Sequence, residues 1–284
     1  MKGKVFILGT LLILLQILSC STRVDVPDNR VFSVEDLSQK KVGVQIGNTA
    51  EAYVAEYGGD SAKIELERFK TLDEAIGALR RGELDAVLCD DVPASIFVGR
   101  HQSLRILDEP FKEEAYAGVV SKGSGGLLDT VNMALIQMRA MGIYDSIFQS
   151  HVGGEGTYHY KPDSLAGEAS KMAPALKIAT NADFPPYEFR TENGLGGIDI
   201  EIARYLADFM ERPLEIIDMG FDSIIDAVRE GKADIGLAAF SVTEERERLV
   251  SFTDTYAKSR VVVVVRSDES ESILTRIKDT LFGI

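Results

Sequence analysis

The sequence predicts an α/β protein with two lobes, because short apolar strands alternate with amphipathic helices in two separate series. The first series begins near Phe32 and the second near Ala175. A chain of 284 residues is long enough to give each lobe its own hydrophobic core. A stretch rich in glycine, serine and charged residues, 151–173, separates the two series and predicts a linker.

The first 19 residues have the features of a secretory signal peptide. Lys2 and Lys4 precede an apolar run, 5–18, that is too short to predict a membrane span. The run ends in Ile-Leu-Ser-Cys, which resembles the lipobox of bacterial lipoproteins. That resemblance implies cleavage before Cys20, a lipid on its sulfur, and residence on the extracytoplasmic face of a bacterial membrane. Residues 20–30 are polar and predict a tether.

Composition excludes several classes of function. The net charge of −14 disfavours binding to nucleic acid. Cys89 lies in an apolar run and is expected to be a small buried hydrophobic residue, which leaves Cys20 without a disulfide partner. The three histidines have no ligand spacing with cysteine or with one another, so we expect neither a metal site nor a cofactor.

The first series predicts a helical turn at its start, followed by strands and helices in alternation. A helix is expected to open with a capping box from Thr71 to Glu74. A long amphipathic helix is expected later, with a break near Gly142. The expected segments are a turn at 33–37, strands at 41–47, 64–69, 84–89 and 116–121, and the long helix at 127–148.

The second series repeats the alternation. Its expected segments are strands at 175–180, 214–218, 233–240 and 261–265, and helices at 198–211, 223–230 and 272–282. A further helix starts after Ser241, with Thr243 as its N-cap and acidic residues in its first turn. Arg246 then lies near free backbone N–H groups, and a guanidinium beside such donors suits a small carboxylate. Local chemistry alone leaves open that Arg246 is one of several solvated arginines.

Taken together, these motifs resemble the periplasmic solute-binding proteins of ABC transporters, in the polar amino-acid family (family 3). Residues 177–266 resemble its opening half, through the runs at 179–189, 197–203, 221–225, 233–235 and 241–246. Residues 33–155 resemble its closing half, through the runs at 33–37, 41–49, 84–90 and 142–147. The resemblance implies a periplasmic-binding-protein type II fold, in which a two-segment hinge joins two α/β lobes.

The order of the halves departs from the family, because the closing half comes first. We expect one circularly permuted chain; a fragment that completes itself between two chains also fits. The expected divisions are a signal peptide at 1–19, a tether at 20–30, lobe 2 at 31–117, lobe 1 at 118–155 and 175–265, a linker at 156–174, and a tail at 266–284 that can join lobe 2. Crossing segments are expected at 116–121 and 261–267, and the chain is expected to be a monomer.

The resemblance also implies how an amino acid is held across the cleft. Arg246 takes the carboxylate with backbone N–H groups of Ser241 and Thr49. Asp90 takes the ammonium with the Ser241 hydroxyl and the Ala239 carbonyl. Without the resemblance, Asp90 at the end of a strand could equally be a helix N-cap.

Other residues are expected to contact the ligand side chain. Phe184 and Phe221 would lie on either side of it, unless each belongs to the core. Asn181 stands where members that select lysine or arginine often have an aspartate, and Gln45 supports a polar ligand. Carboxylates that could replace that aspartate are those of Asp183 and Glu188. The ligand class is therefore a polar L-amino acid, with a basic or amide side chain.

The sequence thus predicts a lipid-anchored binding protein, not an enzyme, that delivers its ligand to the permease of an ABC importer. One alternative is an enzyme of the same fold, such as a cyclohexadienyl or arogenate dehydratase. That reaction needs a general acid in the cleft, for which Asp90 and Asp183 are the candidates. Another alternative is a sensor or adhesion lipoprotein that keeps the fold but not transport.

Overall fold

The computed structural model describes residues 31–152, 159–161 and 173–267. All of them belong to one compact unit that begins at Val31. The expected signal peptide, Cys20 with its tether, the helix expected at 272–282 and most of the linker lie outside the described residues. Among the described residues, no helix is both long and apolar enough to span a bilayer.

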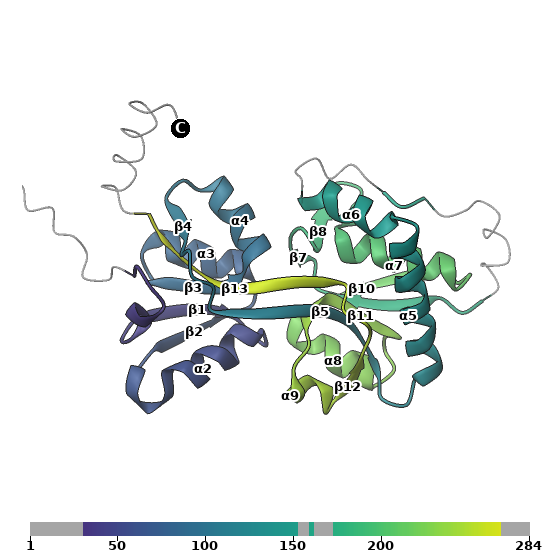
Figure 1. The fold of residues 1–284 in the computed structure, drawn as a ribbon, viewed down its shortest axis with the longest axis horizontal. Helices are drawn as coiled ribbons and strands as arrows, with labels where there is room; N and C mark the ends of the chain where they lie inside the picture. The colour runs from purple at the N-terminus through teal and green to yellow at the C-terminus, as the bar shows by residue number, and fades with distance from the viewer. Residues whose placement is uncertain (1–30, 153–158, 162–172, 268–284) are drawn as a thin grey trace, which may run out of the picture. The chain divides into compact units, whose positions relative to one another are not determined.

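The first half of the described chain is a parallel sheet with helices packed on it, drawn in purple and blue in Figure 1. Strand β1 pairs in parallel with β2 and β3, as strand–helix alternation predicts. The capping box from Thr71 to Glu74 is present, which confirms the predicted start of α3. The elements are η1 (Glu35–Leu37), β1 (Lys41–Gln45), α2 (Thr49–Ala62), β2 (Glu65–Phe69), α3 (Leu72–Arg81), β3 (Ala86–Asp90), α4 (Asp91–Arg100) and β4 (Leu104–Ile106).

The second half repeats this arrangement, because β6 pairs in parallel with both β10 and β11. The predicted break in the long helix is confirmed at Gly142, whose φ of +68° separates α5 from α6. The elements are α5 (Gly125–Ala140), α6 (Ile143–Val152), β6 (Leu176–Thr180), β7 (Asp183–Phe184), β8 (Glu188–Thr191), β9 (Gly194–Gly196), α7 (Ile198–Phe209), β10 (Leu214–Asp218), α8 (Phe221–Arg229), β11 (Ile235–Ser241), α9 (Glu244–Glu247) and β12 (Val250–Phe252).

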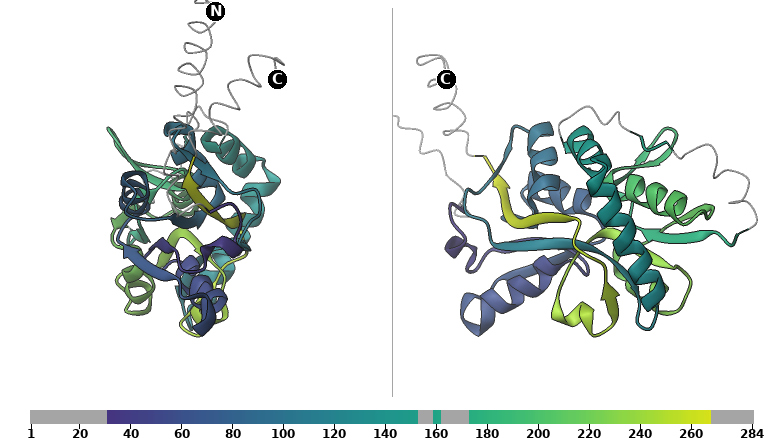
Figure 2. Two further views of the ribbon diagram at one scale, coloured as in Figure 1. Left: turned by 90° about the vertical axis from the view of Figure 1, so that its left-hand side faces the viewer. Right: turned by 45° about the vertical axis from the view of Figure 1, so that its right-hand side comes forward.

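Two ten-residue strands, β5 (Lys112–Ser121) and β13 (Ala257–Arg266), connect the halves and run between them in Figures 1 and 2. The main sheet has the order β10-β6-β11-β5-β13-β3-β1-β2, while β12 pairs with β5 and β4 pairs with β13. Strand β5 leaves the first half and pairs with β11 and β12 of the second. Strand β13 leaves the second half and pairs with β3 and β4 of the first. Each half is therefore completed by a strand that arrives from the other.

The crossing lies earlier in both strands than the sequence predicts. The two strands pair with each other over 112–116 and 257–261. The expected crossing segments, 116–121 and 261–267, share only Tyr116 and Val261 with that pairing. The apolar runs mark where each strand is buried after it has crossed, whereas the crossing residues themselves are largely polar. The lobe boundaries expected at residues 117 and 118 stay a prediction.

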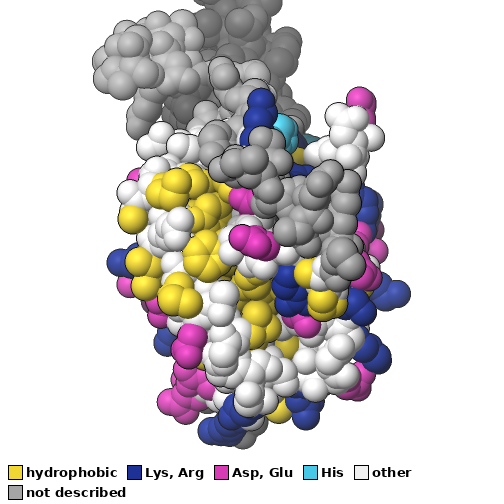
Figure 3. Space-filling view, turned by 90° about the vertical axis from the view of Figure 1, so that its right-hand side faces the viewer, with side chains coloured by type: hydrophobic (Ala, Val, Ile, Leu, Met, Phe, Trp, Pro, Cys, Tyr) yellow, Lys and Arg dark blue, Asp and Glu magenta, His cyan; other side chains and the backbone are white. Residues whose placement is uncertain are grey.

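Helix α5 is amphipathic, as predicted, and packs against α6 and α7. Val131, Leu135 and Met138 are buried on its inner face. Met133 and Ile136 are exposed to solvent on the same helix. Figure 3 shows the side of the molecule where α5 lies, and apolar side chains gather there. Helix α5 therefore presents apolar residues both to the core and to solvent.

Both ends of the described core lie beside the start of strand β4. The carbonyl of Val31 accepts a hydrogen bond from Arg105 at 3.4 Å. The N–H of Ser267 donates to the carbonyl of Ser103 at 2.8 Å. The residue that enters the first half and the residue that leaves β13 are thus neighbours in space.

Candidate functional site

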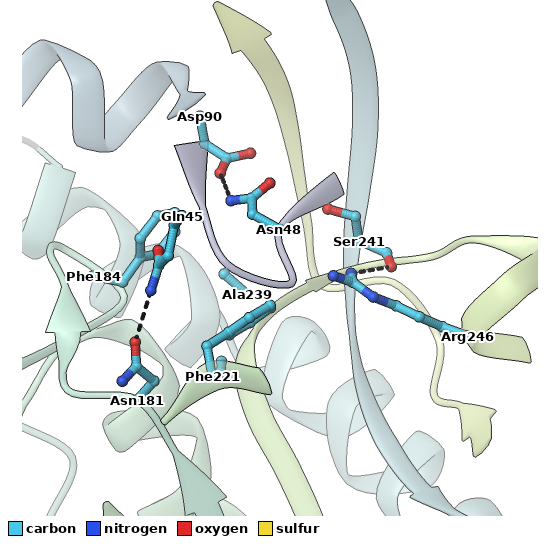
Figure 4. A pocket seen from close by; sticks show the side chains of 10 residues that line it. Gln45, Asn48, Asp90, Asn181, Phe184, Phe221, Ala239, Ser241 and Arg246 are labelled. Carbon is cyan, nitrogen blue, oxygen red and sulfur yellow. Dashed lines mark hydrogen bonds between the residues drawn. The ribbon is translucent and has the colours of Figure 1, made fainter. Parts of the chain in front are cut away.

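A small cavity lies where strand ends from the two halves face each other (Figure 4). The C-terminal ends of β1, β3, β6 and β11 all reach it, which is the edge of a parallel sheet where ligands usually bind. Its volume is about 10 Å³, which is roughly the space for one water molecule. The lining residues are Gln45, Asn48, Asp90, Asn181, Phe184, Phe221, Ala238, Ala239, Ser241 and Arg246. These include most of the residues that the sequence predicts.

Arg246 bridges the two halves of the molecule. It lies in α9, where the Thr243 side chain accepts the Arg246 N–H at 3.2 Å, so the predicted N-cap is confirmed. Its guanidinium donates to the Ser241 carbonyl at 2.9 Å and to the Gly47 carbonyl at 2.8 Å. Arg246 is only 8% exposed, so it is not a solvated arginine. Because a guanidinium has five N–H donors, others remain for a ligand.

Aromatic rings and acidic residues surround this guanidinium. It lies over the rings of Phe221 and Phe240, at 5.5 and 5.4 Å from their centroids. Burial lowers the pKa of Arg246, and the negative charges of Glu114 and Asp90 oppose that effect. An arginine stays charged under these conditions. The site therefore combines a desolvated cation with two nearby carboxyl groups.

Asp90 ends β3 and occupies the N-cap position of α4, yet its side chain makes no capping hydrogen bond. The carboxyl group instead accepts from Ser259 Oγ at 3.3 Å and from Asn48 Nδ2 at 3.5 Å. Burial, followed by the negative charge of Glu114, raises the pKa of Asp90 to about 7. Capping therefore does not explain this side chain, and a bound cation would compensate for the burial of its charge.

Two amides meet across the cavity. Gln45 Nε2 lies 3.3 Å from both Asn181 Oδ1 and the Lys70 carbonyl. Asn181 Nδ2 donates to the Met219 carbonyl at 2.9 Å. Both side chains are about 5% exposed. This part of the cavity therefore offers neutral hydrogen-bonding groups to a ligand.

The two predicted aromatic residues line the same cavity. Phe221 stacks on Phe240 with ring centroids 4.8 Å apart. Phe184 stacks on Tyr187 with centroids 6.1 Å apart. Each ring therefore packs on a core aromatic and also borders the cavity. That they enclose a ligand side chain stays a prediction.

Some expected residues lie outside the cavity lining. The hydroxyl of Thr49 donates to Asn48 Oδ1 at 3.2 Å. Asp183 forms an ion pair with Arg190 at 2.5 Å, and Arg190 also pairs with Asp218. Glu188 is fully buried. Cys20 lies outside the described residues.

The sequence reasoning missed Asn48, Ala238 and Glu114. Asn48 was recognisable only as a helix cap, and it does accept the Ala50 N–H at 3.0 Å. Glu114 comes from the crossing strand β5, and its carboxylate accepts the Ser241 hydroxyl at 2.7 Å. Its sequence neighbours are charged, so nothing in the sequence distinguished it from a solvated residue.

Comparison with known proteins identifies the second half. The family of bacterial extracellular solute-binding proteins, family 3, matches residues 176–282. These 107 of the 284 residues, the family 3 segment, are similar to that family. It contributes Arg246, Ser241 and Asn181 to the cavity, whereas Gln45 and Asp90 come from outside the match. The two-lobed α/β fold is the type II fold of periplasmic binding proteins, as predicted.

Relatives of the family 3 segment are binding proteins by name. An arginine-binding extracellular protein of Bacillus subtilis is 30% identical over 109 residues, which are 38% of this chain and 43% of the relative. An octopine-binding periplasmic protein of Rhizobium meliloti is 33% identical over 93 residues, 32% of each chain. A solved ancestral arginine-binding protein bound to glutamine is 42% identical with a TM-score of 0.28, covering 29% of this chain and 37% of that one. The chain thus spans less than half the length of these relatives.

Proposed function

We propose that this chain is the substrate-binding lipoprotein of an ABC importer and that it binds a polar L-amino acid between its lobes. One observation supports this most: a buried arginine and a buried carboxyl group, Arg246 and Asp90, line a single cavity to which both halves contribute. A free amino acid carries a carboxylate, which suits Arg246, and an ammonium, which suits Asp90. Each of those groups needs its own partner once water is excluded.

The hydrogen bonds within the cavity suggest how the ligand is accepted. With a volume of about 10 Å³, the cavity is too small for an amino acid, so the lobes must separate first. The ligand carboxylate would then bind Arg246 in place of the Gly47 carbonyl, and the ammonium would bind Asp90 in place of Asn48. Closure follows because the ligand contacts both halves only in the closed state, which gives it higher affinity for that state.

The side-chain end of the ligand would meet Gln45 and Asn181. Neutral amides can hydrogen-bond either an amide or a guanidinium, but they bring no charge to compensate a cation. Asp183 lies outside the cavity lining and is paired with Arg190. We therefore expect an amide side chain to bind at least as well as a basic one, although the two relatives named above are an arginine-binding and an octopine-binding protein.

A panel of L-amino acids, each titrated by calorimetry into the delipidated protein, tests the proposal. We expect micromolar binding of one or a few polar amino acids, with the D-enantiomers far weaker. Absence of binding across the panel would contradict it. Incubation with prephenate and arogenate tests the enzymatic alternative, and turnover of either would exclude a role limited to binding.

We infer that the halves are circularly permuted within one chain. The family 3 segment follows the segment that resembles the family's closing half, and Val31 and Ser267 bond with Arg105 and Ser103 at the start of β4. A family member in the usual order would join these two points, and compact folds tolerate such a change at neighbouring surface ends. Light scattering should give a monomer. A stable dimer would favour exchange of halves between two chains.

Attachment to the membrane is proposed through a lipid on Cys20, on the extracytoplasmic side where the matching family acts. An acyl chain stabilises membrane binding by about 0.8 kcal/mol for each buried CH2 group. Cys20→Ser should therefore move the protein from the membrane fraction to the soluble fraction. Retention in the membrane fraction would show another anchor.

A further inference from the structure

Strand β11 carries a bulge of three residues beside the cavity. Its pairing with β5 shifts between Gly236 and Phe240, so three residues, 237–239, lie opposite Gly118 alone. The N–H and carbonyl of Gly118 instead bond with Thr253, both at 2.9 Å. The pairing of β11 with β6 also stops at Gly236. The peptide groups of the bulge, residues 237–239, therefore lie outside the sheet ladder.

Ala239, the last residue of the bulge, has a strained backbone. Its φ of +48° is a left-handed value that a non-glycine residue seldom adopts. Such a conformation persists only where its surroundings hold it. Ala239 is buried and lines the cavity.

The group that holds it is Asp199, in the first turn of α7. Asp199 Oδ2 accepts the Ala239 N–H at 2.8 Å. The same oxygen accepts the hydroxyl of Tyr256 at 2.8 Å. Tyr256 immediately precedes the crossing strand β13, and its N–H donates to the carbonyl of Tyr116 in β5 at 2.8 Å. One buried carboxylate therefore contacts both the cavity wall and the start of the crossing strands.

Burying this carboxylate costs free energy. Asp199 is 1% exposed, and burial raises its pKa to about 6, although the bonds from Ala239 and Tyr256 lower it. Glu188 faces it from β8, and burial together with the charge of Asp199 raises the pKa of Glu188 well above its usual range. Burial, followed by the negative charge of Asp199, raises the pKa of Tyr144 in α6. A hydrophobic residue would avoid this cost, so a role in positioning is favoured over a role in stability.

We propose that Asp199 is a positioning residue of the ligand site: it holds the bulge at 237–239 so that Ala239 faces the ligand, and it joins that bulge to the crossing strands through Tyr256. This inference rests on the proposed binding of an amino acid. It adds a residue that touches no ligand and that the sequence analysis did not place at the site.

Two substitutions at Asp199 and one control test the proposal. Asp199→Asn keeps an oxygen that can accept both hydrogen bonds, so we expect affinity within about threefold of the unaltered protein. Asp199→Ala removes the acceptor, and we expect affinity to fall by roughly tenfold or more, because the hydrogen bonds to Ala239 and Tyr256 are lost. Asp208→Asn is the control. Asp208 lies in the same helix, α7, but it accepts a hydrogen bond from the Tyr160 hydroxyl instead of one from the bulge, so this variant should leave affinity unchanged.

Affinity is measured by calorimetry at 15 °C with the tightest-binding amino acid of the panel, on protein shown to be folded by circular dichroism. Amide hydrogen exchange at Ala239, followed by NMR without ligand, is the second readout. We expect exchange at Ala239 to be faster in Asp199→Ala, and its amide proton resonance to move in Asp199→Asn but not in Asp208→Asn.

If Asp199 has only a structural role, Asp199→Ala will have a lower melting temperature, but the folded variant will bind the ligand with unchanged affinity. That result would overturn the proposal. If Asp199→Ala does not fold, an unchanged Ala239 resonance in Asp199→Asn overturns it instead. If the unaltered protein binds no amino acid, the proposed function fails, while exchange at Ala239 still shows whether Asp199 holds the bulge.

Discussion

Arg246→Ala is the most direct test of the ligand site. The guanidinium is buried, bonds to carbonyls from both halves, and lies over two aromatic rings. Its removal would leave a ligand carboxylate desolvated and without a cation. We therefore expect binding to be lost while the fold is retained.

The magnitude follows from the burial of the pair. A buried charge that loses its partner costs about 3–5 kcal/mol. That cost corresponds to a loss of affinity of roughly two to four orders of magnitude. Arg246→Lys keeps the charge, but an ammonium lacks the planar pair of N–H donors that can bind a carboxylate bidentately. We expect a smaller loss for it, of about one to two orders of magnitude.

Calorimetry with the best ligand of the panel measures these losses. Arg248→Ala is the matched control, because Arg248 is exposed and lies two residues further along the chain. We expect the control to bind normally. Thermal unfolding without ligand should show a fall of only a few degrees for Arg246→Ala, since about 1 kcal/mol corresponds to roughly 2–4 °C in a chain of this size. Unchanged affinity in Arg246→Ala would remove this residue from the site.

Three further predictions concern protons and packing. Ligand binding at about pH 6 should release up to about one proton, because burial raises the pKa of Asp90 to about 7 and a bound ammonium would lower it. Calorimetry in two buffers of different ionisation enthalpy measures the proton release. Identical binding heats in the two buffers would contradict this prediction. The unliganded protein should lose stability as the pH rises from about 4 to about 7, because the folded state holds the proton of Asp199 more tightly than the unfolded state does. The contribution is on the order of 3 kcal/mol, and melting curves of Asp199→Asn should lack it; equal pH dependence in both proteins would argue against this assignment. Gly197→Ala should destabilise strongly, because the new Cβ would lie 2.2 Å from the Tyr187 carbonyl oxygen at a φ of +124°. Gly231→Ala is its control, because Gly231 also has a positive φ, +72°, but has open space around the added Cβ. Comparable melting temperatures for the two variants would contradict a steric clash at Gly197.

Local patterns were sufficient for the elements that carry the site. Arg246 follows a buried strand and a threonine N-cap, and Asp90 ends a buried strand, so both could be placed near a sheet edge from the sequence. Hydrophobic period and capping chemistry act over a few residues, which is why these predictions agree with the structure. The break at Gly142 and the capping box at Thr71 were accessible for the same reason.

Contacts between distant segments were decided only by the tertiary structure. Glu114 and Lys112 belong to a charged run typical of a solvated loop, yet that run forms the crossing strand and bonds with Ser241. Asp183 pairs with Arg190, which also pairs with Asp218, and the sequence does not indicate this contact. Asp199 had no visible role until the bulge of β11 was packed against α7. The sequence by itself indicates which face of an element is buried, but the free energy of a buried charge depends on partners that only folding brings within hydrogen-bonding distance.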